Sequence, residues 1–571
     1  MNRMSPKKEF LLAGAVFLIV ALIFHWQSTP HSAHGPLPEN ADVSDMFFSA
    51  WVIDWDTEAL LQLKRPLFNA PIFAPHRDTL AYSEHMMGLA LLALPVTLVS
   101  GESLISVQVV LVISTVLTGW MVYMLIRALG GTMTGAALGG IIASLAPLRL
   151  LHAPSHPHVL VLWWIPFCLW CLHRAYETRT AKWFWFLGAG IVAQGLFSMH
   201  GLFFLLIALG CAGIIYGIGH ERRMQWWSMV GGTILGALLL LIPLLAPYIR
   251  LSRDPQFTRP PTEQFAFAAS LQDFFSPPTF SSAAALEHQI GPGLTPLALL
   301  LFLAGAACVT QRRQRAASMR RLLPSRLLAA YGLMGLAGLL LALGPQMHLT
   351  PHSSAALPGP LWLLGALPGF SGIRAIGRFA HLTLVSIAVM TGLLWDYGMA
   401  LVRQPWRGRV TILIAALLCA EFFATAPRAF AIDPALTAPR PLDDWLARQG
   451  TSCVVAELPL DDVRTVNNES ARFMYLARFH HKRLVNGYSG FFPKGYHALE
   501  QITFSEHATD ALPLLAELGA DILVLHPTSY PDEYRTQVLE EFRADPRVEA
   551  VTSFPDSYVF RLSREGGIEC L

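Results

Sequence analysis

Four acidic side chains lie close together near the start of a chain that is otherwise poor in charge. Asp45, Asp54, Asp56 and Glu58 fall within the segment SDMFFSAWVIDWDTEALLQL, whereas charged residues make up 14% of the 571 residues. An aspartate in a partly dry pocket can act as a general base, because burial raises its pKa toward neutral pH. Asp45 suits this role, and it equally suits an N-terminal helix acid that complements the macrodipole beside a Ser44 cap.

Asp54 and Asp56 form an Asp-x-Asp pair, a pattern that can hold a divalent cation such as Mg²⁺ or Mn²⁺. The two carboxylates share a face only in an extended chain, because side chains two positions apart on an α-helix point in directions that differ by about 200°. A cation or acceptor pocket is therefore one reading of the pair. Solvation of the outer face of a helix is the other, and it suits Asp54 better.

Glu84 and His85 stand directly before an apolar run, in the segment YSEHMMG. We expect them to line the same pocket, where they bind acceptor or metal, or else to cap the helix that follows. His200 and Asp273 are pocket residues of lower rank. The alternative for Asp273, in LQDFFSPP, is a turn acid ahead of two prolines.

Three histidines crowd the loop His152-Ala-Pro-Ser-His156-Pro-His158. Such a density is typical of metal sites. No acid or cysteine stands near them in the sequence, and the prolines prevent helical spacing. Solvated loop histidines are therefore the favoured interpretation.

The elements that must position these residues belong to a polytopic membrane protein. Hydrophobic residues make up 53% of the chain, against about 45–50% in soluble domains that carry about 25% charged residues. This apolar content excludes a disordered chain. The 41 Lys and Arg against 39 Asp and Glu leave a net charge of +2, which argues against a nucleic-acid partner.

Eleven apolar stretches are long enough to cross a membrane, a task that needs about 20 residues. They are 10–26, 104–127, 132–150, 159–173, 183–198, 200–219, 226–249, 293–310, 327–344, 377–402 and 409–426. The stretch 86–101 is shorter and contains Pro95, so it is interpreted as a juxtamembrane or re-entrant helix. If it does not cross, Arg3, Lys7 and Lys8 and the six arginines of 311–326 all fall in the cytoplasm, as the positive-inside rule requires.

The outer side then receives the longer segments. The first loop, 27–103, contains an expected amphipathic surface helix with Phe47, Trp51 and Trp55 as membrane anchors. The first 426 residues form the membrane domain, and 427–571 form an outer α/β domain. Strands are expected at CVVAELPL, ADILVLHP, RVEAVTSF and YVFRLS, and helices at PLDDWLARQ, DALPLLAELG and DEYRTQVLEEFRA. The fold class is thus mainly α, with a C-terminal α/β domain.

Two groups of side chains depend on this sidedness. Five of the seven cysteines lie in apolar runs, so only Cys453 and Cys570 can meet outside the membrane, and their disulfide is a guess. Arginines at the outer ends of spans are unexpected, because positive charge is enriched on the cytoplasmic side. Phosphate binding by their guanidinium groups would explain them. The candidates are Arg149, Arg250, Arg374 and Arg378. Arg374 and Arg378 are expected on one helical face, and snorkelling is favoured for the other two.

The order of parts and two short motifs resemble the GT-C-type glycosyltransferases, which use polyprenyl-phosphate-linked sugars. Ser44-Asp45-Met46-Phe47-Phe48 is similar to the acid-aromatic motif that follows the first span in aminoarabinose and protein O-mannosyltransferases, although it lacks the second acid. The segment YSEHMMG followed by LALLALPVTLVSG is similar to a second motif of that class, with Met86 and Met87 in place of two prolines. The strings Arg374-Ala-Ile-Gly-Arg378-Phe379 and Asn486-Gly-Tyr-Ser-Gly490 resemble bacterial relatives of the YfhO type.

The resemblance implies an inverting transferase of the bacterial inner membrane, acting on its periplasmic side. The donor would be a polyprenyl-phosphate-linked sugar. The acceptor would be a glycan, lipid or protein of the envelope, and membrane lipids would surround the protein. Asp45 would then be the base, and the loop Asn486–Pro493 could stack on sugars. A non-catalytic protein that binds or transports a lipid-linked glycan is the alternative. Apart from end positions, the spans carry almost no charge, which counts against ion-coupled transport.

Overall fold

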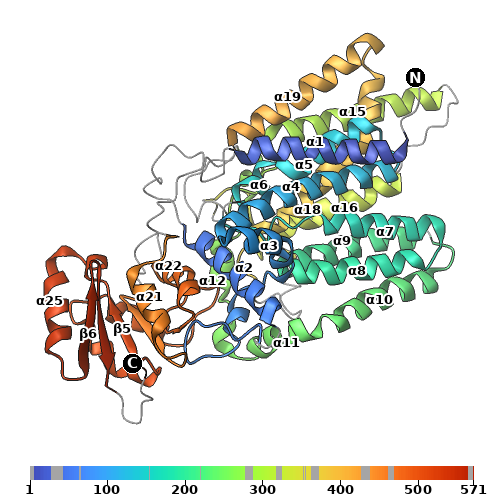
Figure 1. Cartoon of the computed structure of the whole chain (residues 1–571). Coiled ribbons are helices and arrows are strands. Elements are labelled where there is room, and N and C mark those ends of the chain that lie inside the picture. Colours follow the sequence, from blue (N-terminus) through green and yellow to red (C-terminus); the bar gives the residue numbers. More distant parts are fainter. Residues whose placement is uncertain are drawn as a thin grey trace. The chain divides into compact units, whose positions relative to one another are not determined.

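The computed structural model describes residues 5–26, 43–62, 66–153, 155–218, 220–276, 287–316, 325–351, 353, 355–361, 372–425, 437–460, 469–563 and 570. The chain divides into two compact units, each assembled from separate segments (Figure 1). Unit 1 comprises Met1–Ala33, Gln108–Ile249 and Thr258–Ala429, and unit 2 comprises His34–Val107, Arg250–Phe257 and Phe430–Leu571. The segment His34–Val107 therefore groups with the C-terminal segment.

Unit 1 is built from long apolar helices. Eight helices or helix pairs in the described part of the chain are long and apolar enough to cross a membrane. They comprise α1 (Pro6–Trp26), α4 (Ser103–Ala128), α5 (Met133–Leu145) with α6 (Pro147–Leu151), α9 (Met199–Ile218), α15 (Leu294–Ala316), α16 (Ser325–Ala342), η5 (Ile376–Phe379) with α18 (Ala380–Ala400), and α19 (Arg407–Thr425).

The remaining three expected spans are also helical but shorter or bent. The stretch 226–249 consists of α10 (Arg223–Leu240) and α11 (Ile242–Leu251), which meet at 74°. Helices α7 (Trp164–Thr178) and α8 (Lys182–Phe197) have 15 and 16 residues. All eleven stretches therefore form helices, and their number as membrane crossings stays a prediction. Part of the arginine-rich segment 311–326 lies outside the described residues.

Helix α18 forms the centre of unit 1, where it packs against α5, α15 and α16 (Figure 1). Small residues allow the close approach of α5. A Cβ atom added to Gly135 would lie 2.4 Å from the carbonyl oxygen of Gly392, and one added to Gly139 would lie 2.6 Å from that of Ala388. Glycines four positions apart are the usual means by which apolar helices come into backbone contact. A second group, α7 to α10, packs beside α9.

Unit 2 begins with α2 (Ser44–Gln62), η2 (Thr79–Tyr82) and α3 (Met87–Ser100). Helix α3 is the expected short apolar helix at 86–101. The amphipathic interpretation of α2 is wrong, because its aromatic anchors Phe47, Trp51 and Trp55 are all buried. Helix α2 packs against α3 and α22 (Glu469–Leu476), so apolar residues are needed around most of its circumference.

The C-terminal part of unit 2 is an α/β domain, as expected. Its five-stranded sheet has the order β4-β3-β5-β7-β6, with β3 (Val454–Leu458) parallel to β4 (Arg483–Leu484) and β5 (Ile522–Leu525). Strands β7 (Ser557–Leu562) and β6 (Val548–Phe554) complete it in antiparallel pairing. All residues of β3 and β5 are buried, which explains their apolar sequences. The exception is Glu457 in β3, which forms an ion pair with Arg440 at 2.8 Å. The helices are α21 (Pro441–Arg448), α22, α23 (Tyr496–Thr503), α24 (Leu512–Glu517) and α25 (Asp532–Ala544).

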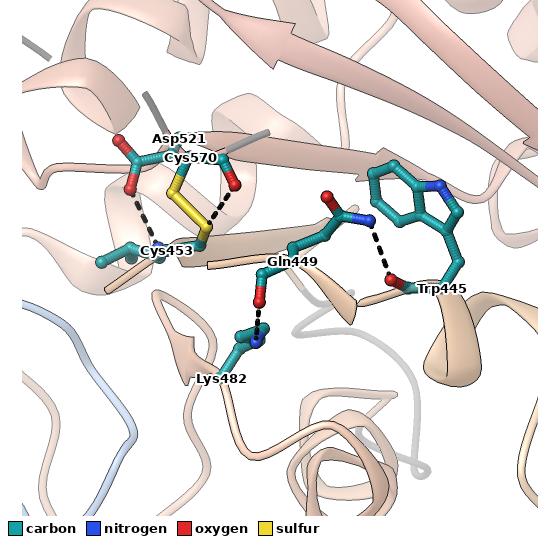
Figure 2. Close-up of a disulfide and its surroundings, with 7 residues drawn as sticks. Trp445, Gln449, Cys453, Lys482, Asp521 and Cys570 are labelled. Atoms are coloured by element: carbon teal, nitrogen blue, oxygen red, sulfur yellow. Dashed lines mark hydrogen bonds between the residues drawn. A yellow bond between two sulfur atoms is a disulfide. The ribbon is translucent and has the colours of Figure 1, made fainter. Parts of the chain in front are cut away.

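A disulfide closes this domain. Cys453, which precedes β3, is bonded to Cys570, and their Cα atoms are 5.5 Å apart (Figure 2). Hydrogen bonds fix the backbone before and after Cys453. The Nζ atom of Lys482 donates to the carbonyl oxygen of Gln449 at 2.8 Å, and Val454 N–H donates to Asp521 at 3.0 Å. The pairing guessed from the sequence is confirmed.

Candidate functional site

Asp45 lies in the first turn of α2 and is engaged by an aromatic side chain from the C-terminal domain. The hydroxyl group of Tyr488 donates to Asp45 Oδ1 at 2.9 Å. The Tyr488 ring packs edge-on against Phe48 of α2, with ring centroids 5.8 Å apart. Two separate motifs, SDMFF and NGYSG, therefore meet at one carboxylate that remains partly accessible. A partly accessible carboxylate can still accept a proton from a bound hydroxyl group.

The Asp54 and Asp56 carboxylates do not converge. Asp56 is fully buried, and its Oδ2 accepts the Met86 N–H at 2.7 Å, directly before α3. Burial raises the pKa of Asp56 to about 8. Asp54 faces Arg478, with Nε 3.8 Å from Oδ2, and burial raises its pKa as well, while Arg478 opposes that shift. This pair therefore does not fit a shared divalent cation, since one carboxyl caps a helix and the other forms an ion pair.

Glu84 and His85 are both buried beside α3 in unit 2. The imidazole of His85 lies edge-on to Phe68, with ring centroids 6.0 Å apart. The start of α3 shows no side-chain cap bond at its N-cap residue, Met86. The Asp56 carboxyl group accepts the Met86 N–H and so stabilises the chain directly before α3.

The loop histidines of unit 1 are mostly buried, which corrects the expectation that they are solvated. His152 is 1% exposed and His158 is 7% exposed. Ring centroids are 5.5 Å apart for His152 and His156, and 5.9 Å apart for His156 and His158. His200 joins the same row, 6.3 Å from His158. The sequence-distant His381 lies 6.0 Å from His152.

An acid that the sequence did not associate with these histidines also belongs here. Glu287 is buried and forms an ion pair with Arg378, whose Nε lies 3.1 Å from both carboxylate oxygens. Burial would raise the pKa of Glu287, but Arg378 and His152 together hold it well below its usual range. Burial also lowers the pKa of His152. Gly377 permits this arrangement, because a Cβ there would lie 2.3 Å from the carbonyl oxygen of Glu287.

The four arginines proposed for phosphate differ in how their guanidinium groups are occupied. Arg149 is fully buried and donates to Thr115 and to two carbonyl groups. Arg250 forms an ion pair with Asp78 at 2.8 Å. Arg374 and Arg378 do not share an α-helical face, because Arg374 precedes the 3₁₀ helix η5 that contains Arg378. Arg374 is 39% exposed at its side chain and lies 4.0 Å from Glu263.

Asp273 and the aromatic loop have structural partners. Asp273 accepts from the backbone N–H and the hydroxyl group of Ser270, which forms a capping box at α13 (Leu271–Phe275). In the loop Asn486–Pro493, Phe492 stacks on Tyr496 and lies edge-on to Phe73. The Asn486 side chain bonds the backbone of Glu457. These contacts explain the loop through packing.

Sequence reasoning missed three contributors, namely the Tyr488 hydroxyl group, Glu287 and His381. Tyr488 stands in a motif that was recognised, but nothing in its spacing points to Asp45, which is 443 positions away. Glu287 and His381 are separated from the histidine loop by long stretches of chain, and no local pattern joins them. Co-variation between two positions across related sequences is the kind of signal that could find such contacts.

The sequence matches no protein-family model and no curated protein. Solved structures are similar in fold. The arabinofuranosyltransferase AftD from Mycobacteria has a TM-score of 0.59 and 15% identity over 98% of this chain, which spans 40% of that transferase. An oligosaccharyltransferase from Archaeoglobus fulgidus, tethered to an acceptor peptide, has a TM-score of 0.53 and 11% identity over 96% of this chain and 74% of that one.

A further similar structure is the oligosaccharyltransferase AglB from the same archaeon, in complex with an inhibitory peptide and a dolichol-phosphate. Its TM-score is 0.51, with 13% identity over 90% of this chain and 69% of that one. At these identities a likeness shows the fold alone. The chain therefore has the fold of the GT-C-type membrane glycosyltransferases.

Proposed function

We propose that this protein is a membrane glycosyltransferase that moves a sugar from a polyprenyl-phosphate-linked donor to an envelope glycan, lipid or protein. The similar solved structures are an arabinofuranosyltransferase and oligosaccharyltransferases, and one of them is a complex with a dolichol-phosphate. The Cys453–Cys570 disulfide supports an oxidising surrounding for unit 2, such as the bacterial periplasm. The protein would then lie in the inner membrane, with this unit outside the cytoplasm.

The observation that carries the proposal is the Asp45–Tyr488 contact. It brings the acid-aromatic motif after the first helix into contact with the NGYSG motif, and both belong to unit 2. A tyrosine hydroxyl group that donates to a carboxylate oxygen fixes the orientation of the carboxylate, and the Asp45 side chain is partly accessible. Asp45 is therefore our proposed general base.

The reaction that follows is a single displacement. Asp45 accepts the proton of the acceptor hydroxyl group, the acceptor oxygen forms a bond to the anomeric carbon, and the bond from that carbon to the phosphate oxygen breaks. The configuration at the anomeric carbon is inverted, and polyprenyl phosphate leaves with its charge. Of the four proposed arginines, we assign Arg374 to that phosphate, because its side chain is partly exposed and its only acidic neighbour among the described residues, Glu263, is 4.0 Å away.

Replacement of the proposed base tests the function. Asp45→Asn keeps the size of the side chain and an oxygen that can accept from Tyr488, but it cannot take up a proton in this step. We expect sugar transfer from a polyprenyl-phosphate donor to fall about 10²- to 10⁴-fold. Transfer is measured with full-length protein in membranes. Asp444→Asn, on the exposed side of α21, is the matched control and should transfer normally.

The same assay separates the proposed function from its alternative. Normal turnover by well-expressed Asp45→Asn protein would remove Asp45 as the base. Binding of the lipid-linked glycan without any transfer by wild-type protein would instead favour a non-catalytic protein. Addition of a chelator, followed by Mg²⁺ or Mn²⁺, tests whether the transfer reaction requires a divalent cation.

A further inference from the structure

A large cavity lies within unit 2, on the face of α2 that carries Trp51, Asp54, Trp55 and Glu58. Its volume is about 1150 Å³, and its other walls come from the segment after α2, the end of α3 and residues 477–483. The Trp55 indole is fixed by a hydrogen bond from Nε1 to the carbonyl oxygen of Leu67 at 2.7 Å. Ligand sites of proteins occupy about 300–1,000 Å³, so the cavity is large enough for a ligand.

The charges of the cavity are unevenly compensated. Arg478 pairs with Asp54, and its Nη2 also lies 3.1 Å from Glu102. Glu58 accepts from Gln62 and lies 3.9 Å from the His481 ring nitrogen. The remaining charged groups of the lining are two exposed arginines, Arg77 and Arg483, for which no acidic partner is present among the described residues. The cavity therefore offers two guanidinium groups to an anion.

Part of the cavity lining is apolar and exposed. Leu61, at the end of α2, is 54% exposed, and Leu98, at the end of α3, is 63% exposed. Val99 follows Leu98 and is 90% exposed. Helix α3 is apolar, and its 14 residues are fewer than the about 17–25 that a membrane span usually has. Exposed aliphatic side chains beside arginines are typical of a surface that contacts both the acyl chains and the headgroups of a bilayer.

This cavity is separate from the proposed catalytic aspartate. Asp45 and Asp54 are nine residues apart, which corresponds to about two and a half turns and about 14 Å along a helix. Asp45 bonds to Tyr488, and neither residue is among those that line the cavity. A ligand in the cavity would not occupy the position of the acceptor at Asp45.

We propose that the cavity binds an anionic phospholipid of the membrane. Arg77 and Arg483 hold the phosphate of its headgroup, and Leu61 and Leu98 contact the first part of its acyl chains. The site is independent of the proposed transfer chemistry, because it uses neither Asp45 nor Tyr488. Such a lipid would hold the ends of α2 and α3 at the membrane surface.

Native mass spectrometry of the full chain in detergent tests this site, with phosphatidylglycerol as the probe and phosphatidylethanolamine for comparison. Wild-type protein should retain more phosphatidylglycerol than phosphatidylethanolamine. The double variant Arg77→Ala/Arg483→Ala should retain it about tenfold less, since charge-assisted bonds to phosphate are lost. Arg561→Ala, an exposed arginine on β7, is the matched control and should bind as wild type does.

Two further variants keep the test decisive. Arg77→Lys/Arg483→Lys retains both charges and should bind within about threefold of wild type, which separates loss of charge from loss of fold. Asp45→Asn should bind normally, even where it abolishes transfer. Displacement of phosphatidylglycerol by polyprenyl phosphate, but not by inorganic phosphate, would support the site and identify a lipid of the donor type as a second occupant. Equal retention of phosphatidylglycerol by the double alanine variant, or no preference over phosphatidylethanolamine, would overturn the proposal.

Discussion

The Asp56 carboxyl group is fully buried, and burial raises its pKa to about 8. In the folded protein it therefore keeps a proton that the unfolded chain releases near pH 4. The contribution of Asp56 to stability is then greatest at low pH and falls as the pH rises from about 4 to about 8, by up to about 1.4 kcal/mol per pH unit. Above pH 8 this contribution no longer changes.

Asp56→Asn should remove this dependence, because the amide stays neutral and its oxygen can still accept the Met86 N–H. We expect the variant to gain stability relative to wild type as the pH rises. The measurement is the thermal unfolding midpoint of both proteins in detergent at pH 5, 7 and 9. Parallel curves for the two proteins would contradict the raised pKa.

At the scale of single residues, the sequence was informative about chemical type and less so about partners. Asp45 could be selected as a base because it stands at a helix start in a charge-poor chain. Its partner Tyr488 could not be selected, because only the folded chain brings residues 443 positions apart together. Arg378 was selected for a phosphate, and its ion pair with Glu287 depends on the same kind of distant contact.

Among the elements, η5 and the segment at Glu287 approach closely at Gly377. Gly377→Ala would place a Cβ atom 2.3 Å from the carbonyl oxygen of Glu287, so one backbone must move. We expect a loss of about 1–3 kcal/mol of stability, as is typical of overpacking. Fluorescence-detected size-exclusion chromatography after a heat step measures it. Gly372→Ala, whose added Cβ meets no atom within 4 Å, should behave as wild type. Equal thermal tolerance of the two variants would disprove the close approach.

Elements with a strong local pattern were predicted well. Strands β3 and β5 are short and mainly apolar, and α25 matches its expected range of residues. Helix α2 was predicted as a helix but given the wrong surroundings. Its aromatic spacing suits a membrane surface as well as a buried contact with α22 and α3, and only the packing of distant segments decides between them.

For the whole molecule, sidedness depends on α3 not crossing the membrane. Ser100→Cys, at the exposed end of α3, should react in intact cells with a maleimide that cannot cross membranes. Ser318→Cys, in the arginine-rich segment, should react only after permeabilisation. Labelling of Ser100→Cys only from the cytoplasmic side would reverse the predicted topology.

The disulfide should make a measurable contribution to the stability of unit 2. Its closure of a chain segment with a sequence separation of 117 residues reduces the entropy of the unfolded state, and such bonds contribute about 2–4 kcal/mol. Cys453→Ser should lower the unfolding midpoint, and a reductant should lower that of wild type to the same value. Cys308→Ser, which removes an exposed free thiol, serves as the control. An unchanged midpoint in Cys453→Ser would show that the bond contributes little.

The same sulfur–sulfur link has a practical consequence for anyone who probes this protein with proteases. It encloses β3 and β5 and the segments between them in one covalent loop. A single cut inside that loop leaves both fragments attached to each other. Nicking would therefore go unnoticed on a gel run without reductant, and it would become visible as two bands only once the sample is reduced.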